Sequence, residues 1–225
     1  SSTKLSDNPE DIVELAQIEE FVKRFPDTST IIINGGDPLM MPPEYYYGII
    51  EILERLNCPA QISFTTNLWA FYKKPDMWEA LFKHSRVEVC TSFQYGNARL
   101  KGDLTPFTEE EFIAVSDLML ERIGYRPPFI AVITRENEDS VIKTVELAKR
   151  LGVEAKINYA VASGEEVVYK GVRMGNVNAM FTQAEMYKHY LSIYDAGLMD
   201  FEYNTKQMVG KLQNANTTCP LARTC

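Results

Sequence analysis

The chain reads Thr30-Ile31-Ile32-Ile33-Asn34-Gly35-Gly36-Asp37-Pro38 where a short β-rich run ends in a glycine turn. A helical pattern follows, so the stretch predicts a βα unit, and α/β proteins bind ligands at the carboxyl ends of their strands. Two glycines let the backbone approach a small molecule closely, and the Asp37 carboxylate accepts hydrogen bonds from an ammonium group. A turn of this composition also serves purely conformational purposes, so both interpretations stay open here.

The same alternation of strand and helix recurs along the chain. Strands are expected over 30–33, 61–67, 87–93, 129–134 and 153–159. Helices are expected over 11–25, 45–56, 75–82, 112–123, 137–151 and 181–196, and no clear period is found in the last residues. Successive βα units need right-handed crossovers, which predicts a parallel sheet in an α/β protein.

Composition and charge narrow the classes of function. The chain has 225 residues, 45% of them hydrophobic and 24% charged, which suits one globular α/β domain. Its formal net charge of -8 argues against broad binding to nucleic acid or to an anionic membrane. No apolar run approaches ~18 residues and the amino terminus lacks a signal-peptide layout, so a cytoplasmic protein without a membrane partner is expected.

The turns at the strand ends resemble those of radical S-adenosylmethionine (SAM) enzymes, in particular the peptide-modifying branch with a SPASM or twitch extension. Gly35-Gly36-Asp37-Pro38 resembles the Gly-Gly-Glu-Pro motif, with aspartate in place of glutamate. Thr66-Asn67 resembles the Thr-Asn-Gly turn, with Leu68 where glycine is common. The resemblance implies that Gly35, Gly36, Asp37 and Pro38 hold the SAM ammonium and that Thr66 and Asn67 also bind the cofactor.

Three later segments extend this resemblance. Ser92 matches a serine that hydrogen-bonds the SAM ribose or carboxylate, and Gln94 stands where an aspartate is frequent. Arg99 matches an arginine that pairs with the SAM carboxylate, a task suited to a guanidinium. Asn158 lies where the family places the adenine. These four residues are therefore implied as further cofactor ligands.

The fold that the resemblance implies is a partial (β/α)6 TIM-like barrel of parallel strands with a small C-terminal extension. Residues 1–160 would form the partial barrel, without its first strand and cluster loop. Residues 161–225 would hold the barrel remainder and the start of a SPASM/twitch-like extension.

The cysteines depart from the family pattern. The Cys-x3-Cys-x2-Cys motif that holds the family's [4Fe-4S] cluster is absent from the chain, and its expected position is just before Ser1. Truncation would explain this, and a naturally cluster-free relative is the competing account. Cys219 and Cys225 resemble ligands of an auxiliary [4Fe-4S] cluster, and two terminal thiols or a disulfide is the alternative.

The resemblance implies a radical SAM enzyme that generates a 5′-deoxyadenosyl radical to modify a peptide or protein substrate. A thioether or carbon-carbon crosslink in a ribosomal peptide precursor is one example, with flavodoxin or ferredoxin as external electron donor; no catalytic residue is identified. A cluster-free βα-barrel module that binds a peptide or ligand without redox chemistry is the alternative. A third hypothesis, aldolase-like chemistry, would use Lys156 as a Schiff-base lysine.

Polar residues outside these motifs have plainer interpretations. His84 and His189, the only histidines, are predicted to be surface helix residues. Asn137 is either the N-cap of a helix or a ligand contact, and Arg135 is either solvated or a ligand contact.

Overall fold

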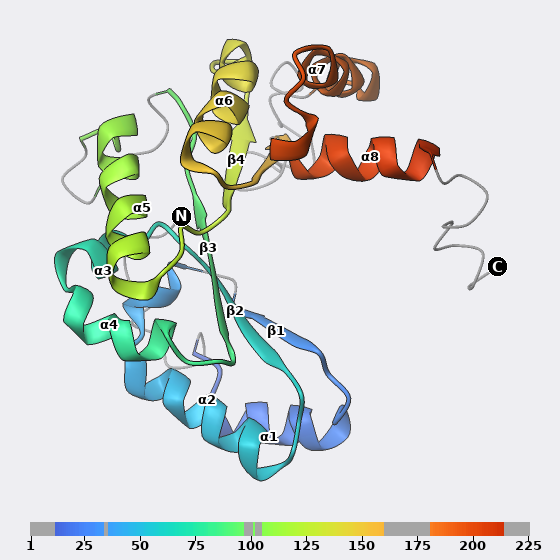
Figure 1. The fold of residues 1–225 in the computed structure, drawn as a ribbon. Coiled ribbons are helices and arrows are strands. Elements are labelled where there is room, and N and C mark those ends of the chain that lie inside the picture. Colours follow the sequence, from blue (N-terminus) through green and yellow to red (C-terminus); the bar gives the residue numbers. More distant parts are fainter. Residues whose placement is uncertain (1–11, 34–35, 97–100, 102–104, 160–180, 214–225) are drawn as a thin grey trace, which may run out of the picture. The chain divides into compact units, whose positions relative to one another are not determined.

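The computed structural model describes residues 12–33, 36–96, 101, 105–159 and 181–213. The chain forms two compact units. The first unit comprises Ser1–Ser92 and Lys101–Pro127, and the second comprises Phe93–Leu100 and Pro128–Cys225. Each unit contains parallel strands with helices packed on them (Figure 1).

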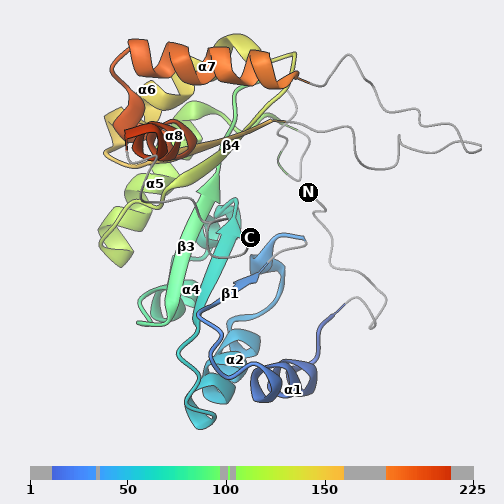
Figure 2. The same ribbon diagram turned by 90° about the vertical axis from the view of Figure 1, so that its right-hand side faces the viewer.

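The first unit contains three strands that pair in parallel in chain order. They are β1 (Thr30–Ile33), β2 (Gln61–Thr66) and β3 (Val87–Ser92). Its helices are α1 (Leu15–Arg24), η2 (Pro38–Met40), α2 (Pro43–Arg55), α3 (Trp69–Lys73), α4 (Pro75–Phe82) and α5 (Glu109–Ile123). Helices α1 and α2 lie side by side in both views (Figure 1, Figure 2).

Helices cover one face of β2 and β3. Along β2, half-buried residues alternate with buried ones, as expected for a strand with one covered face. Phe64 lies at the centre, and its ring centroid is 4.7 Å from that of Tyr46 in α2 and 6.0 Å from that of Phe82 in α4. Burial of each such side chain contributes roughly 1.5–3 kcal/mol. Thr66 and Thr91 are register partners at the carboxyl end of this face.

The second unit contains two parallel strands, β4 (Phe129–Ile133) and β5 (Ala155–Tyr159). Its helices are η3 (Glu138–Ser140), α6 (Val141–Leu151), α7 (Gln183–Asp195), η5 (Met199–Phe201) and α8 (Tyr203–Gln213). Its core joins both strands to α6 and α7 through Ile133, Val145, Ile157 and Ile193, each at most 1% exposed. Helix α7 also packs on α8 (Figure 2).

A buried carboxylate docks α8 against β5. Glu202 is 0% exposed, and its Oε1 accepts hydrogen bonds from the N–H groups of Ile157 and Asn204. Its Oε2 accepts two more, from the N–H and the hydroxyl of Thr205. Asn204 Nδ2 in turn donates to the Ile157 carbonyl at 2.6 Å. Every acceptor site of this buried charge is therefore used within the unit.

The structure confirms an α/β protein whose strands are parallel, and all five strands expected from the sequence are present. The six-stranded barrel and the division of the chain at residue 160 stay predictions. The sequence prediction missed α3 and α8; α3 has only five residues, and the residue that α8 buries is polar, namely Thr205. Within the residues that the structure describes, no helix is both long and apolar enough to cross a membrane.

Candidate ligand site at the ends of β1 and β2

The turn after β1 is organised around the Asp37 carboxylate. Oδ1 accepts hydrogen bonds from the N–H of Leu39 at 3.0 Å and from the hydroxyl of Thr66 at 2.7 Å. Oδ2 accepts one from the N–H of Asn67 at 3.0 Å. The first contact caps η2, and the other two tie the turn to the end of β2. Asp37, Thr66 and Asn67 are thus brought together, as their motifs suggest.

The turn after β2 is fixed by its own side chains. The Thr66 hydroxyl accepts a bond from the N–H of Leu68, and Asn67 Oδ1 accepts one from the N–H of Trp69 at 2.8 Å. Leu68 has φ +59°, in the left-handed region that favours glycine. The Thr-Asn-Gly turn that this segment resembles has glycine at this position. Leu68 is 0% exposed, so burial of its side chain offsets a conformational cost of roughly 1–2 kcal/mol.

Two buried hydroxyl groups beside this site behave differently. The Tyr46 hydroxyl donates to the Pro38 carbonyl at 2.6 Å and so anchors the turn to α2, and burial raises the pKa of Tyr46. Thr91, the register partner of Thr66, is 1% exposed, and its hydroxyl has no hydrogen-bond partner among the described residues. At the carboxyl end of the helix-covered face, the Thr66 hydroxyl is therefore hydrogen-bonded, whereas the Thr91 hydroxyl has no partner among the described residues.

The Asp37 carboxylate accepts the hydrogen bonds described above from neutral donors alone. A carboxylate offers about four acceptor sites, and the three bonds named above leave one on Oδ2. In the described part of the chain, no lysine, arginine or histidine forms an ion pair with Asp37. A half-buried carboxylate of this kind favours a cationic ligand with an N–H group, because a charge-assisted hydrogen bond is stronger than a neutral one.

The other predicted ligands fall in different places. Gly36 is exposed beside Asp37, Pro38 is buried, and Ser92 is the half-buried last residue of β3. Gln94 and Asn158 belong to the second unit, where Asn158 is exposed on β5. The remaining predicted ligands, namely Gly35, Arg99, Cys219 and Cys225, lie outside the described residues.

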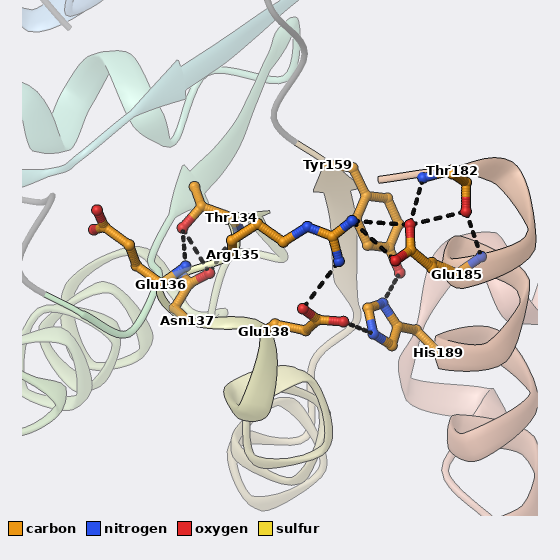
Figure 3. Close-up of polar contacts among 9 residues, drawn as sticks. All are labelled: Thr134, Arg135, Glu136, Asn137, Glu138, Tyr159, Thr182, Glu185 and His189. Atoms are coloured by element: carbon orange, nitrogen blue, oxygen red, sulfur yellow. Dashed lines mark hydrogen bonds and ion pairs between the residues drawn. The ribbon is translucent and has the colours of Figure 1, made fainter. Parts of the chain in front are cut away.

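A second polar cluster lies at the carboxyl ends of β4 and β5 (Figure 3). Arg135 donates from Nη2 to both carboxylate oxygens of Glu185 at 2.9 Å and from Nη1 to Glu138 at 3.2 Å. The other oxygen of Glu138 lies 3.1 Å from His189 Nε2, and His189 Nδ1 lies 3.0 Å from the Tyr159 hydroxyl. This cluster links β5, η3 and α7.

The electrostatics of the cluster follow from these contacts. The Arg135 guanidinium, followed by the N–H and hydroxyl of Thr182, lowers the pKa of Glu185 to about 2. Burial raises the pKa of Tyr159, whose ring stacks on His189 with an interplanar angle of 16°. Each polar group that Figure 3 links has a partner within the second unit, so the cluster holds α7 against the strand ends.

The structure corrects both histidine predictions and refines the interpretations of Arg135 and Asn137. His84 lies beyond the end of α4 at Phe82, so it is not a helix residue, and its side chain is 29% exposed. His189 is in a helix, but its side chain is only 15% exposed and binds Glu138, so the prediction of a surface residue is wrong. Arg135 has a side chain that is 32% exposed, and it is paired with two carboxylates. Asn137 lies at the N-cap of η3 without capping it, since its side chain binds Thr134 and the Tyr95 carbonyl instead.

No group of three or more histidine, cysteine, aspartate or glutamate side chains that suits a metal ion is found within the described residues. Cys58 is buried and its thiol faces the Thr28 carbonyl at 3.7 Å, while Cys90 is half-buried in β3. These two thiols do not fit a cluster site. The predicted metal ligands are not among the described residues, so their role stays a prediction.

Comparison with solved structures supports a radical SAM-like fold. Nine chains match, and one is described as native anSMEcpe with bound AdoMet, that is S-adenosylmethionine. It matches with a TM-score of 0.60 and 15% sequence identity, over 79% of this chain and 50% of that chain. The chain therefore spans half the length of that protein. No family model and no curated protein matches the sequence, so the likeness is one of fold alone.

Proposed function

We propose that this chain carries the S-adenosylmethionine site of a radical SAM enzyme that modifies a peptide or protein substrate. The observation that carries the proposal is the Asp37 carboxylate, held by Thr66 and Asn67 at the strand ends and without an ion pair in the described part of the chain. The radical SAM-like fold supports the same function.

The residues of the turn have distinct tasks in this proposal. Asp37 accepts a hydrogen bond from the SAM ammonium on its remaining acceptor site. Thr66 and Asn67 are positioning residues, because they bind the carboxylate rather than the ligand. Gly36, which is exposed and has no side chain, lets the cofactor approach the backbone. Ser92, Gln94, Arg99 and Asn158 are proposed as further ligands on the strength of the family motifs.

The reaction needs parts that the described residues do not supply. S-adenosylmethionine yields a 5′-deoxyadenosyl radical when an iron-sulfur cluster reduces it, and a flavodoxin or ferredoxin would deliver the electron. The two described thiols do not fit such a cluster, so the proposal places its ligands outside the described residues. An auxiliary cluster at Cys219 and Cys225 belongs to the same proposal.

Calorimetric titration of the chain with SAM tests the ammonium site. Asp37→Asn removes a charge-assisted hydrogen bond worth roughly 1.5–3 kcal/mol, so SAM should bind about 10- to 150-fold more weakly. An analogue without the α-amino group should bind wild type and variant equally. Asp27→Asn, an exposed position in the same unit, is the matched control and should bind SAM like the wild type.

The titration has two outcomes that contradict the proposal. If Asp37→Asn binds SAM as tightly as the wild type does, Asp37 does not bind the ammonium group. If the variant binds SAM and the analogue without the α-amino group equally more weakly, Asp37 has a general structural role instead. Activity needs a separate measurement on the full-length protein, reconstituted with iron and sulfide under anaerobic conditions. Formation of 5′-deoxyadenosine is expected, whereas SAM binding without it would favour the cluster-free module.

A further inference from the structure

A solvent-open groove lies in the first unit beside η2, the helix that Asp37 caps. It has a volume of about 350 Å³ and is lined by η2 and the residues just after it, and by α3, α4 and the turn between them. Met40 and Met41 line it from the side of η2, and Met77 and Trp78 line it from α4. The remaining lining residues are Leu39, Pro42, Ala70, Lys73 and Lys74.

The lining is apolar and adaptable. Trp78 is only 2% exposed, whereas Met40 is 40% exposed and Met77 is 47% exposed. Methionine side chains are flexible and polarisable, and clusters of them are common on surfaces that bind varied apolar partners. Large apolar side chains that gather in a groove differ from the scattered exposed ones of an ordinary surface.

The backbone under these side chains is held firmly. The Asp37 carboxylate caps η2, and the Tyr46 hydroxyl binds the Pro38 carbonyl at the start of the same helix. On the side of α3 and α4, Lys74 is the C-cap residue of α3 and immediately precedes Pro75, the first residue of α4. A preorganised backbone reduces the entropy lost on binding, while the methionines keep their freedom to adapt.

The groove is positively charged at its edge, in contrast to the net charge of -8 of the whole chain. Lys73 and Lys74 are exposed, and neither forms an ion pair with any residue that the structure describes. The nearest acidic neighbour in sequence, Asp76, is paired with Arg122. The Lys73 ammonium lies 5.4 Å from the centroid of the Trp69 ring, a contact with a neutral group that leaves its charge uncompensated, so both lysines can pair with an acidic partner.

We propose that this groove binds a peptide segment of a partner protein that presents apolar anchors flanked by carboxylates. The methionines and Trp78 would receive the anchors, and Lys73 and Lys74 would pair with the carboxylates. The exposed walls favour a peptide over a fatty acyl chain, which needs an enclosed cavity. The volume lies near the lower end of the roughly 300–1,000 Å³ of small-molecule pockets, which suits one or two side chains. This inference does not depend on SAM binding.

Fluorescence anisotropy with defined probes tests the proposal on the full chain. The probe is a fluorescein-labelled 12-residue peptide with leucines at positions i, i+4 and i+7 and glutamates elsewhere. One control peptide replaces the glutamates with lysines, and another replaces the leucines with serines. The protein variants are Lys73→Glu/Lys74→Glu and Met77→Ser, with Lys188→Glu and Leu120→Ser as controls at exposed positions outside the groove. Thermal unfolding checks that each variant is folded.

The expected pattern is specific. The leucine-glutamate peptide should bind the wild type at least about tenfold more tightly than either control peptide. Lys73→Glu/Lys74→Glu should reverse the preference between glutamate and lysine peptides, Met77→Ser should weaken binding several-fold, and the two control variants should leave it unchanged. Absence of binding, or equal effects of groove and control variants, would overturn the proposal. Displacement of the peptide by dodecanoate at equal concentration would also overturn it, in favour of an acyl ligand.

Discussion

The Thr66 hydroxyl donates a 2.7 Å hydrogen bond to Asp37 across a separation of 29 residues. The bond joins the turns at the ends of two neighbouring strands, and it gives Thr66 a task other than the direct cofactor contact that its motif implies. Because the side chain is 1% exposed on the helix-covered face, in the proposed site it would act through the carboxylate that it positions.

The threonine pair at the ends of β2 and β3 allows a matched test of that bond. Thr66→Val should lower the free energy of unfolding by about 1–3 kcal/mol, because Asp37 loses a partner in a partly buried site. Thr91→Val should be close to neutral or stabilising, since its buried hydroxyl has no partner among the described residues. Urea unfolding measures both values. Similar losses for the two variants would contradict the assigned roles.

The ion pair between Arg135 and Glu185 predicts an acid-sensitive contribution to stability. Because Arg135 lowers the pKa of Glu185 from 4.5 to about 2, the ionised form stabilises the folded state at pH values above 4.5. That stabilisation should be lost as the pH falls from 4.5 towards 2. The midpoint of thermal unfolding, measured from pH 6 to pH 2, should therefore fall less steeply in Glu185→Gln than in the wild type.

Asp195→Asn, an exposed change on the same helix, is the control for the acid titration. It should keep the wild-type slope. A Glu185→Gln variant whose slope also equals that of the wild type would show that the pair does not stabilise the fold.

The Glu202 carboxylate should be sensitive to a change that keeps its shape. Glu202→Gln replaces one acceptor oxygen with an amide that faces N–H donors, so the loss of stability should be about 1–3 kcal/mol or more. Hydrogen exchange should show the loss of protection at α8 and β5. Glu136→Gln, at an exposed position, should change neither stability nor exchange. Equal exchange in both variants would count against the docking role of Glu202.

Two helical glycines predict opposite packing effects. Gly210→Ala on α8 should stabilise the protein by roughly 0.5–1 kcal/mol, because no atom lies within 4 Å of an added Cβ and alanine is the better helix former. Gly48→Ala on α2 should gain less or lose stability, since its Cβ would lie 2.6 Å from Leu15 Cδ1. Urea unfolding of both variants checks the order, and a larger gain at Gly48 would contradict it.

The strands were predicted well from the sequence, because their apolar and β-branched residues directly indicate buried segments. Phe129–Ile133 is a strand in which every second residue is buried, and the predicted segment ended within one residue of it. The Asp37 turn was also predictable, since glycine, aspartate and proline have strong turn preferences. Local residue type is sufficient evidence for features of this kind.

Features that depend on distant partners were not predictable. Helix α8 buries Thr205 rather than an apolar residue and is held by Glu202, whose partner Ile157 lies 45 residues away. His189 gave no sequence signal of burial, because its partners Glu138 and Tyr159 come from other elements. The sequence does not single out Glu202 either, because the exposed Asp200 lies two residues before it in the same segment.

The side chains that dock α8 also occupy backbone hydrogen-bonding groups at the edge of β5. On the side of Ile157 that faces away from β4, Glu202 takes the N–H and Asn204 takes the carbonyl. An uncovered strand at this position would offer both groups to a strand from another molecule and so promote aggregation. Two side chains here imitate a neighbouring strand and close that edge. Replacement of Glu202 or Asn204 would therefore first reduce solubility, even where the fold survives.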